Sequence, residues 1–376
     1  MKIIVDKNIP YLRGVLEPYA TVVYLAGQVI SRSDLTDADA MIVRTRTKCN
    51  AALLEGTRVR FIATATIGHD HIDAEYCDAH GIRWTNAEGC NSSSVQQYIG
   101  AVLAQLSTQL NFSCNAKTLG IVGVGNVGTK VAALARALGM RVLLNDPPRA
   151  RREGGAGFVP IDTLIEHADI ITFHVPLIDG GRDNTFYMAD ERFLSRLRPT
   201  QIVINTSRGE VVQGSALKAL LQRGGLQACV LDVWEQEPMI DIELLHKCVI
   251  GTPHIAGYSA DGKANGTSMS VNALSRFFGW GALDAWKPGD VPAPREPEFT
   301  LDCEHLSKQD AIKRAILHTY DICADDERLR RSVQTFERQR ADYPLRREFT
   351  SYTITLKNAS SSIRSALETL GFTCRS

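Results

Sequence analysis

The sequence predicts an α/β protein built from two interleaved parallel-sheet domains and a small C-terminal α+β domain. Short β-type runs alternate with helical stretches from residue 2 to about residue 260, which is typical of parallel sheets. A glycine-rich strand–turn–helix–strand unit at 119–146 interrupts the first series of these pairs. A proline-rich stretch at 286–297 separates a last patterned region from the rest. The 376 residues agree with two or three domains.

The stretch 119–146 has the pattern of a dinucleotide-binding unit. An apolar run enters a Gly-x-Gly-x-x-Gly turn at Gly123, Gly125 and Gly128, and a helical pattern and a second apolar run follow. The first glycine allows the turn, the second lets a pyrophosphate approach the backbone, and the third lets the helix pack on the strand. Asp146 ends the second run, where a carboxylate would bind an adenosine ribose and repel a 2′-phosphate. We therefore expect a Rossmann domain that prefers NAD to NADP.

The composition predicts a globular protein without a nucleic-acid or membrane partner. Lysine plus arginine and aspartate plus glutamate balance at 42 each, so no overall field attracts a polyanion. The nine cysteines contain no Cys-x-x-Cys pair and suit a reducing compartment. No apolar run has the length of a membrane span, and the N-terminus lacks the plan of a signal peptide. We expect a cytoplasmic protein, and we predict no metal site, because His69 and His71 have no third ligand nearby.

Five β-type runs precede the glycine turn and predict a parallel sheet of the flavodoxin-like type. They are residues 2–6, 21–25, 40–44, 61–65 and 82–86. Ligands of parallel sheets gather where the strands end. The loop after the third run carries Arg44, Thr45, Arg46 and Lys48, and the loop after the fourth carries Thr66. Such loops suit a small anionic substrate, although a solvated loop is the simpler interpretation of either one alone.

Four further β-type runs follow the glycine unit and complete a six-stranded sheet. They are residues 169–177, 201–209, 227–238 and 248–260. An amphipathic helix at 91–110 leads into this domain, and a helix ending near residue 279 leads back, so a cleft between two lobes is expected. The predicted boundaries are 1–94 and 255–285 for the substrate domain, 95–254 for the Rossmann domain, 286–297 for a linker and 298–376 for the C-terminal domain.

Arg208, Glu237 and His254 follow three of these later runs. Each alone is explained by a surface arginine, a solvated acid or a hydrogen-bonded core histidine. Together, beside a dinucleotide site, they are the groups that oxidation of a 2-hydroxy acid requires. His254 would take the hydroxyl proton, Glu237 would fix the imidazole tautomer and raise its pKa, and Arg208 would hold the substrate carboxylate.

The motifs GVGNVG, HVPL, NTSRG, LDVWEQEP and PHIAG occur in this order and resemble those of the D-isomer-specific 2-hydroxyacid dehydrogenases over about residues 1–285. The resemblance implies that Arg208, Glu237 and His254 are catalytic, with His254 the proton donor in the reducing direction. The predicted NAD-binding residues are Gly123, Gly125, Asn126, Val127, Gly128, Asp146, Val175, Pro176, Ser207, Asp232 and Gly257. The predicted substrate-binding residues are Arg44, Thr45, Arg46, Thr66 and Tyr258.

Within this family, the segments TATIGHDHID and EGCN most resemble members that oxidise 4-phosphoerythronate on the pyridoxal phosphate route. The predicted reaction is that oxidation, with NAD as cofactor. Two alternatives stay open. One is the same chemistry on 3-phosphoglycerate, glyoxylate or hydroxypyruvate. The other is a non-catalytic NADH-sensing protein like the C-terminal-binding corepressors, which share the fold.

Residues 298–376 predict a strand, a long helix at about 307–332, a second strand and a last helix. A domain of this kind resembles the dimerisation domain of those relatives, so a homodimer is expected; a regulatory ligand-binding tail is the alternative. Seven arginines of this region predict a solvated face: Arg328, Arg330, Arg331, Arg338, Arg340, Arg346 and Arg347. A weaker hypothesis is a dimer arm that brings Arg346 or Arg347 to the partner's phosphate pocket.

Overall fold

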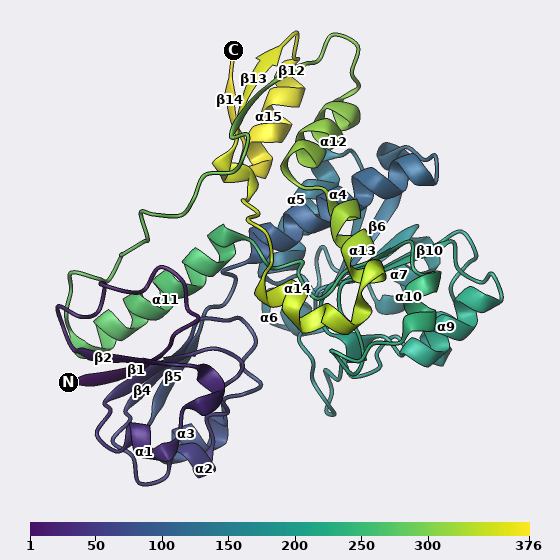
Figure 1. Cartoon of the computed structure of the whole chain (residues 1–376). Coiled ribbons are helices and arrows are strands. Elements are labelled where there is room, and N and C mark those ends of the chain that lie inside the picture. The colour runs from purple at the N-terminus through teal and green to yellow at the C-terminus, as the bar shows by residue number, and fades with distance from the viewer. The chain divides into compact units, whose positions relative to one another are not determined.

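The computed structural model describes all 376 residues, and the chain divides into two compact units (Figure 1). The first unit consists of Met1–Asn91 and Ser259–Pro292. The second consists of Ser92–Tyr258 and Ala293–Ser376. The sequence predicted a separate C-terminal domain; in the structure this region belongs to the same compact unit as the glycine turn.

Five parallel strands form the sheet of the first unit, in the order β2-β1-β3-β4-β5. The strands are β1 (Lys2–Asp6), β2 (Thr21–Leu25), β3 (Ala40–Val43), β4 (Phe61–Thr64) and β5 (Arg83–Asn86). The helices are α1 (Arg32–Leu35), α2 (Ala51–Leu54), α3 (Ala74–Ala79) and α11 (Ala260–Phe278). The strand order is the flavodoxin-like one, and the five predicted strands are confirmed.

This sheet is buried on both faces because successive residues of its apolar strands point in opposite directions. Ile3 and Val5 of β1 pack in one cluster with Val271 of α11, whereas Ile4 packs in the cluster of the other face. The phenyl rings of Phe61 in β4 and Phe277 in α11 stack with centroids 4.7 Å apart. The helix predicted to lead back into this domain is therefore part of its core.

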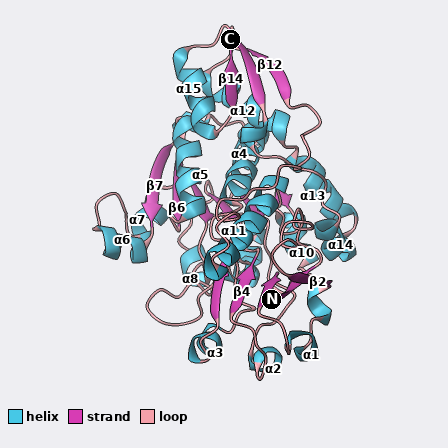
Figure 2. Ribbon diagram, turned by 90° about the vertical axis from the view of Figure 1, so that its left-hand side faces the viewer, coloured by secondary structure: helices cyan, strands magenta, loops and turns pink.

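Six parallel strands form the larger sheet of the second unit, in the order β7-β6-β8-β9-β10-β11. Figure 2 shows β6 and β7 of this sheet side by side, in magenta. The strands are β6 (Thr118–Val122), β7 (Arg141–Asn145), β8 (Ile170–Phe173), β9 (Ile202–Asn205), β10 (Ala228–Leu231) and β11 (Ile250–Gly251). The helices are α4 (Ser92–Gln109), α5 (Asn126–Ala137), α6 (Pro147–Glu153), α7 (Ile161–His167), α8 (Glu191–Leu194), α9 (Gly214–Gln222) and α10 (Ile242–Lys247). The predicted six-stranded sheet and the helix leading into it are confirmed.

The C-terminal region adds a small parallel sheet in the order β12-β13-β14. Its elements are β12 (Glu298–Asp302), α12 (Lys308–Thr319), α13 (Ile322–Arg331), α14 (Phe336–Ala341), β13 (Thr353–Lys357), α15 (Ser361–Leu370) and β14 (Thr373–Arg375). The single long helix predicted here is wrong. Tyr320 is extended, and the Asp321 carboxylate accepts from the backbone N–H groups of Cys323 and Ala324, which starts α13 as a new helix.

The C-terminal region belongs to the second unit because the two share one apolar core. Helices α12 and α15 lie beside α4 and α5 (Figure 1). Ile316 of α12 fills the space at Gly100 of α4, where an added Cβ would lie 3.1 Å from the Ile316 Cδ1 atom. Leu367 of α15 and Leu134 of α5 are fully buried members of the same cluster. Because the apolar side chains of the C-terminal region pack into this shared core, the region is an integral part of the nucleotide-binding unit. None of the helices has the length and apolarity of a membrane span.

Candidate active site

The glycine turn between β6 and α5 has the shape that a dinucleotide needs. Gly123 has a φ of 86°, and a Cβ there would lie 2.5 Å from the carbonyl oxygen of His174. A Cβ at Gly128 would lie 2.0 Å from the Gly123 carbonyl oxygen, so only glycine lets the helix approach the strand. Gly125 is exposed and has no atom within 4 Å of an added Cβ, which leaves room for a phosphate at the N-terminus of α5. The turn therefore fits NAD.

Asp146 lies next to this turn, directly after β7. Its Oδ2 accepts from the backbone N–H of Val124 at 2.8 Å. Its Oδ1 accepts from the N–H of Arg149 at 2.9 Å and caps α6. The carboxylate is thus held at the carboxyl edge of the sheet, beside the turn, as the NAD prediction requires.

The other predicted NAD-binding residues of this unit also follow its parallel strands and therefore lie along the same edge. Asn126 and Val127 begin α5, and Val175 and Pro176 follow β8. The Cγ1 atom of Val175 would be 2.8 Å from a Cβ at Gly123. In a further segment, after β9, the Ser207 hydroxyl donates to the Asn205 side-chain oxygen at 2.7 Å. Gly257 lies half-buried in the loop after β11.

The structure places His254 and Glu237 in direct contact. The His254 Nδ1 and Glu237 Oε2 atoms are 2.7 Å apart, and the side chains are 29% and 18% exposed. Glu237 Oε1 accepts from the backbone N–H of Trp234 at 2.9 Å, which fixes the carboxylate. Burial by itself would raise the pKa of Glu237, but the hydrogen bonds from His254 and Trp234 and the charges of His254 and Arg340 together hold that pKa below its ordinary value. The carboxylate is therefore ionised and sets the imidazole tautomer.

Arg208 follows β9 on the same edge. Its loop is fixed by the side-chain N–H of Asn205, which donates to the Arg208 carbonyl at 2.8 Å. The Arg208 Nη1 atom donates to the Ser207 carbonyl at 2.8 Å. The guanidinium is thus held on the strand-exit loop, and a planar guanidinium is suited to bind an anionic group in fixed geometry.

Asp232 holds the loop that carries His254. Its buried carboxylate accepts from the N–H groups of Ile255 at 2.8 Å and Ala256 at 2.9 Å, and from the hydroxyl of Thr252 at 2.6 Å. Its carbonyl accepts from the His254 N–H at 2.7 Å. Burial raises the pKa of Asp232, and these hydrogen bonds and the charge of His254 oppose that shift. His254 has a φ of 56°, an uncommon conformation for a non-glycine residue, which this set of bonds maintains.

The predicted substrate-binding residues fall in both units. In the first unit, Thr45 and Arg46 are exposed on the loop after β3, and Arg44 donates to the Asn8 carbonyl at 3.4 Å. After β4, the Thr66 hydroxyl lies 2.7 Å from that of Thr64 and donates to the Gly68 carbonyl.

His71 closes this hydroxyl network, with Nε2 3.0 Å from the Thr64 hydroxyl oxygen. Burial lowers the pKa of His71 to about 4, so the ring is neutral near pH 7. No group of three or more His, Cys, Asp or Glu residues is arranged to hold a metal ion.

Tyr258, the substrate residue predicted in the second unit, is covered by the C-terminal region. The Arg340 guanidinium lies over its ring at 5.5 Å from the centroid, and Tyr343 meets it edge-on at 5.9 Å. The charge of Arg340 also contributes to the low pKa of Glu237. The sequence placed Arg340 in a solvated face and did not indicate this contact. One cation in an arginine-rich stretch gives no local sign of the residue that it will meet in the fold.

The prediction that the C-terminal arginines form a solvated face is wrong for Arg346. This residue is 5% exposed, and its Nη2 atom donates to the carbonyls of Ile255 and Ala256 and to the Ser94 hydroxyl. The dimer-arm hypothesis is also wrong for Arg346, because its guanidinium is bound within its own chain. Arg330 likewise donates to the carbonyls of Leu245 and Cys248.

Two protein families match parts of this chain. The family "D-isomer specific 2-hydroxyacid dehydrogenase, NAD binding domain" matches residues 92–256, and "Domain of unknown function (DUF3410)" matches residues 292–371. The erythronate-4-phosphate dehydrogenase of Bacteroides thetaiotaomicron is 49% identical over 94% of this chain and 99% of that protein. That of Escherichia fergusonii is 42% identical over 99% of this chain and 98% of that protein.

Among solved structures, D-lactate dehydrogenase from Aquifex aeolicus, complexed with NAD and lactic acid, superposes with a TM-score of 0.59 at 26% identity. The match covers 74% of this chain and 96% of that one. It therefore spans the shared dehydrogenase fold. The identity to the curated relatives extends over nearly the whole length of both proteins, and the chain belongs to the erythronate-4-phosphate dehydrogenase family of D-isomer-specific 2-hydroxyacid dehydrogenases.

Proposed function

We propose that this protein oxidises 4-phospho-D-erythronate to (R)-3-hydroxy-2-oxo-4-phosphobutanoate with NAD, as a step of pyridoxal 5′-phosphate biosynthesis. The observation that carries the proposal is the 2.7 Å contact between His254 and Glu237, on the sheet edge that also holds the glycine turn. The choice of substrate is supported by relatives named erythronate-4-phosphate dehydrogenase at 42 and 49% identity.

His254 is the acid–base group of the proposed reaction. Because its Nδ1 is bound to Glu237, Nε2 is the ring nitrogen that takes the proton of the substrate's 2-hydroxyl. The ionised Glu237 stabilises the imidazolium that results. Arg208 binds the substrate carboxylate with paired donors and stabilises the oxygen on C2 as it becomes a carbonyl.

When bound, NAD supplies the acceptor for the hydride that leaves C2 of the substrate. The O–H bond of the 2-hydroxyl breaks, its proton goes to His254, and its electron pair forms the second bond between C2 and oxygen. In the reducing direction His254 returns the proton to that oxygen. The residues that would hold the cofactor are the glycine turn, Asp146 beside it, and the segments after β8 and β9.

We propose that the loops after β3 and β4 bind the phosphate group of the substrate. Arg44, Arg46 and Lys48 follow β3 and give the loop its positive charge. Thr45 and Thr66 offer hydroxyl groups after the adjacent strands β3 and β4. A phosphate bound by such groups would distinguish the substrate from unphosphorylated erythronate.

The initial rate of NADH formation by the purified protein tests the proposal. We expect a strong preference for 4-phosphoerythronate over 3-phosphoglycerate and over unphosphorylated erythronate. A parallel assay with an added 2-oxo acid detects cofactor that is reoxidised without leaving the protein. Equal or higher rates on 3-phosphoglycerate would contradict the substrate, and tight NADH binding without turnover on any of these acids would contradict the activity.

We further infer that the enzyme acts in the cytoplasm as a homodimer formed through the C-terminal region. Strands β12 and β14 are the two edges of the small sheet, and an edge strand can pair with a strand of a second chain. Light scattering after size exclusion gives the mass directly, and a mass near 41.3 kDa would contradict the dimer.

A further inference from the structure

Arg346 approaches the catalytic loop from the C-terminal region. Its Nη2 atom lies 3.0 Å from the carbonyl oxygen of Ile255 and 2.6 Å from that of Ala256. The same Nη2 donates to the hydroxyl of Ser94, which itself donates to the Ala256 carbonyl at 2.8 Å. These two peptide units come directly after His254 in the chain.

The amides of the same two residues are bound from within the sheet. The N–H groups of Ile255 and Ala256 donate to the carboxylate of Asp232. Two consecutive residues after His254 therefore have their donors held by a carboxylate and their acceptors held by a guanidinium. A backbone bound at both its donors and its acceptors has little freedom to rotate, and His254 needs such support for its positive φ.

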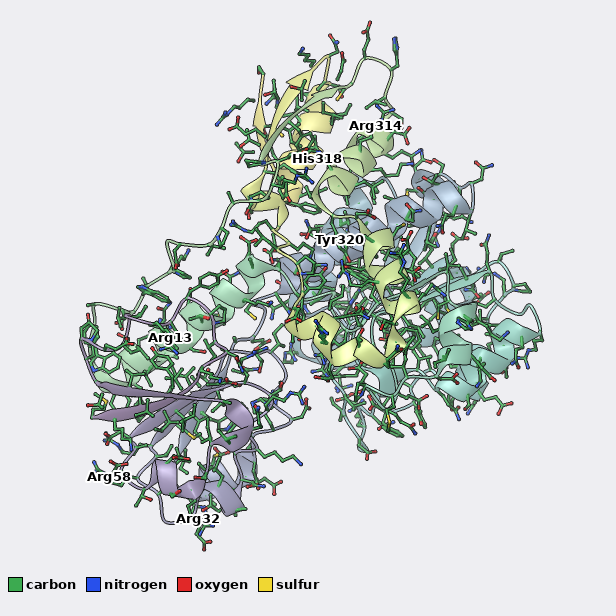
Figure 3. All side chains as sticks on the ribbon, viewed as in Figure 1. Arg13, Arg32, Arg58, Arg314, His318 and Tyr320 are labelled. Carbon is green, nitrogen blue, oxygen red and sulfur yellow. The ribbon has the colours of Figure 1, made fainter.

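The guanidinium is itself fixed by aromatic rings of the C-terminal region. Its Cζ atom lies 4.5 Å from the ring centroid of Tyr320, the residue between α12 and α13 (Figure 3), and 5.6 Å from that of Tyr343. Both phenol hydroxyls donate to the buried carboxylate of Asp325, at 2.8 and 2.6 Å. Asp325 and Asp232 supply the negative charge that a buried guanidinium requires. A continuous polar network thus joins the C-terminal region to the loop of His254.

We propose that Arg346 is a positioning residue: by holding the carbonyls of Ile255 and Ala256, it keeps His254 in the conformation that contacts Glu237. The C-terminal region then completes the active site of its own chain, whatever else it does in assembly. The inference rests on the proposed function, in which His254 is the acid–base group.

Arg330 provides a matched control. It is a C-terminal arginine that also donates to two carbonyls of the nucleotide-binding sheet domain, those of Leu245 at 3.0 Å and Cys248 at 2.9 Å. Those carbonyls belong to the end of α10 and the residue after it, and not to the loop of His254. Loss of either arginine weakens the attachment of the C-terminal region, but only loss of Arg346 should affect His254.

The test compares Arg346→Met, Arg346→Lys and Arg330→Met with the wild-type protein. We expect Arg346→Met to lower kcat on 4-phosphoerythronate by about 10- to 100-fold, with NADH affinity unchanged, since misplacing a catalytic group by about 1 Å costs this much. Arg346→Lys should recover part of kcat, because an ammonium still donates to carbonyls. Arg330→Met should keep kcat within about 2-fold of wild type at a similar loss in Tm.

A second measurement does not depend on the substrate. The NMR shifts of the His254 ring nitrogens report whether Nδ1 is bound to Glu237, and we expect them to change in Arg346→Lys but not in Arg330→Met. If the wild-type protein oxidised none of the acids, the proposed function would be contradicted. The NMR shifts would then still decide whether Arg346 positions His254. Unchanged ring shifts in Arg346→Lys, or equal losses of kcat in Arg346→Met and Arg330→Met, would overturn it.

Discussion

The two large parallel sheets of this protein have the same strand order in their first five strands but different first connections. The second strand lies outside the first, and the third, fourth and fifth follow on the other side, in both sheets. In the first unit, residues 7–20 join β1 to β2 without a helix. In the second unit, the glycine turn and the twelve-residue helix α5 join β6 to β7. Only the second connection offers a phosphate the N-terminus of a helix.

The residues that follow the strands differ in the same way. The second strand of the first unit is followed by Ala26, and that of the second unit by Asp146. The carboxyl edge of the first sheet carries hydroxyls and the neutral His71, whereas that of the second carries the ionised Glu237 bound to His254. Strand order therefore determines where a site can form, and the loops determine whether it binds a cofactor or does chemistry.

The largest expected effect comes from replacing the histidine at the carboxyl edge of each large sheet by alanine. His254→Ala should lower kcat by about 10²- to 10⁴-fold, the usual contribution of a general acid–base group, with NADH binding retained. His71→Ala, in the other sheet, should change kcat by less than about 10-fold, because a ring whose pKa burial lowers to about 4 is a poor proton acceptor near pH 7. Steady-state rates and NADH fluorescence measure both. A comparable loss of kcat in the two variants would contradict the contrast between the edges.

Two glycine substitutions separate cofactor binding from folding. Gly125→Ala has room for its Cβ, so the fold should be kept while NAD affinity falls by roughly 10-fold or more, because the methyl occupies the place of the pyrophosphate. Gly128→Ala places a Cβ 2.0 Å from the Gly123 carbonyl oxygen and should lower the free energy of unfolding by about 1–3 kcal/mol or more. Calorimetric titration with NAD and urea unfolding measure the two effects. Gly125→Ala protein that binds NAD as well as wild type would refute the assignment of this turn.

The half-buried His174, which directly follows β8 in the larger sheet, should control stability in acid. Burial lowers the pKa of His174 to about 3, and its ring nitrogens contact the hydroxyls of Thr172 and Thr206. Below pH 6.5 the unfolded chain gains a proton that the folded chain does not, so stability falls as the pH drops towards 3, by about 2 kcal/mol at pH 5. His174→Asn should remove this part of the loss between pH 7 and pH 5 in urea unfolding. If the free energy of unfolding of His174→Asn fell between pH 7 and pH 5 as steeply as that of the wild type, other groups would be the cause of the loss in acid.

The smallest effect is expected at the residue that follows β7. Asp146→Asn removes the charge but keeps an oxygen to accept from the Arg149 N–H, so α6 should stay capped. The preference for NAD over NADP should fall by roughly 10-fold, because an amide does not repel a 2′-phosphate. The ratio of kcat/KM for the two cofactors measures this. Ala26→Asp, at the matching position of the first unit, should leave that ratio unchanged.

The sequence by itself determined the features that depend on neighbouring residues in the chain. All eleven strands of the two large sheets were predicted, since apolar runs bounded by polar turns are local patterns. The glycine turn, Asp146 beside it and the positions of Arg208, Glu237 and His254 after their strands followed from the same patterns. Because the strands of a parallel sheet point in one direction, their ends share one edge, which brought Glu237 and His254 close enough to bond.

Tertiary structure alone decided which charged residues are buried. Arg346 resembles its arginine neighbours in sequence, yet its guanidinium lies against the loop of His254. The carboxylate of Asp232 accepts hydrogen bonds from the amides of that same loop. The merging of the C-terminal region with the nucleotide-binding core is likewise absent from any local pattern. The physical reason is that burying a cation depends on carbonyls, rings and carboxylates brought together from distant segments, and no stretch of sequence contains all of them.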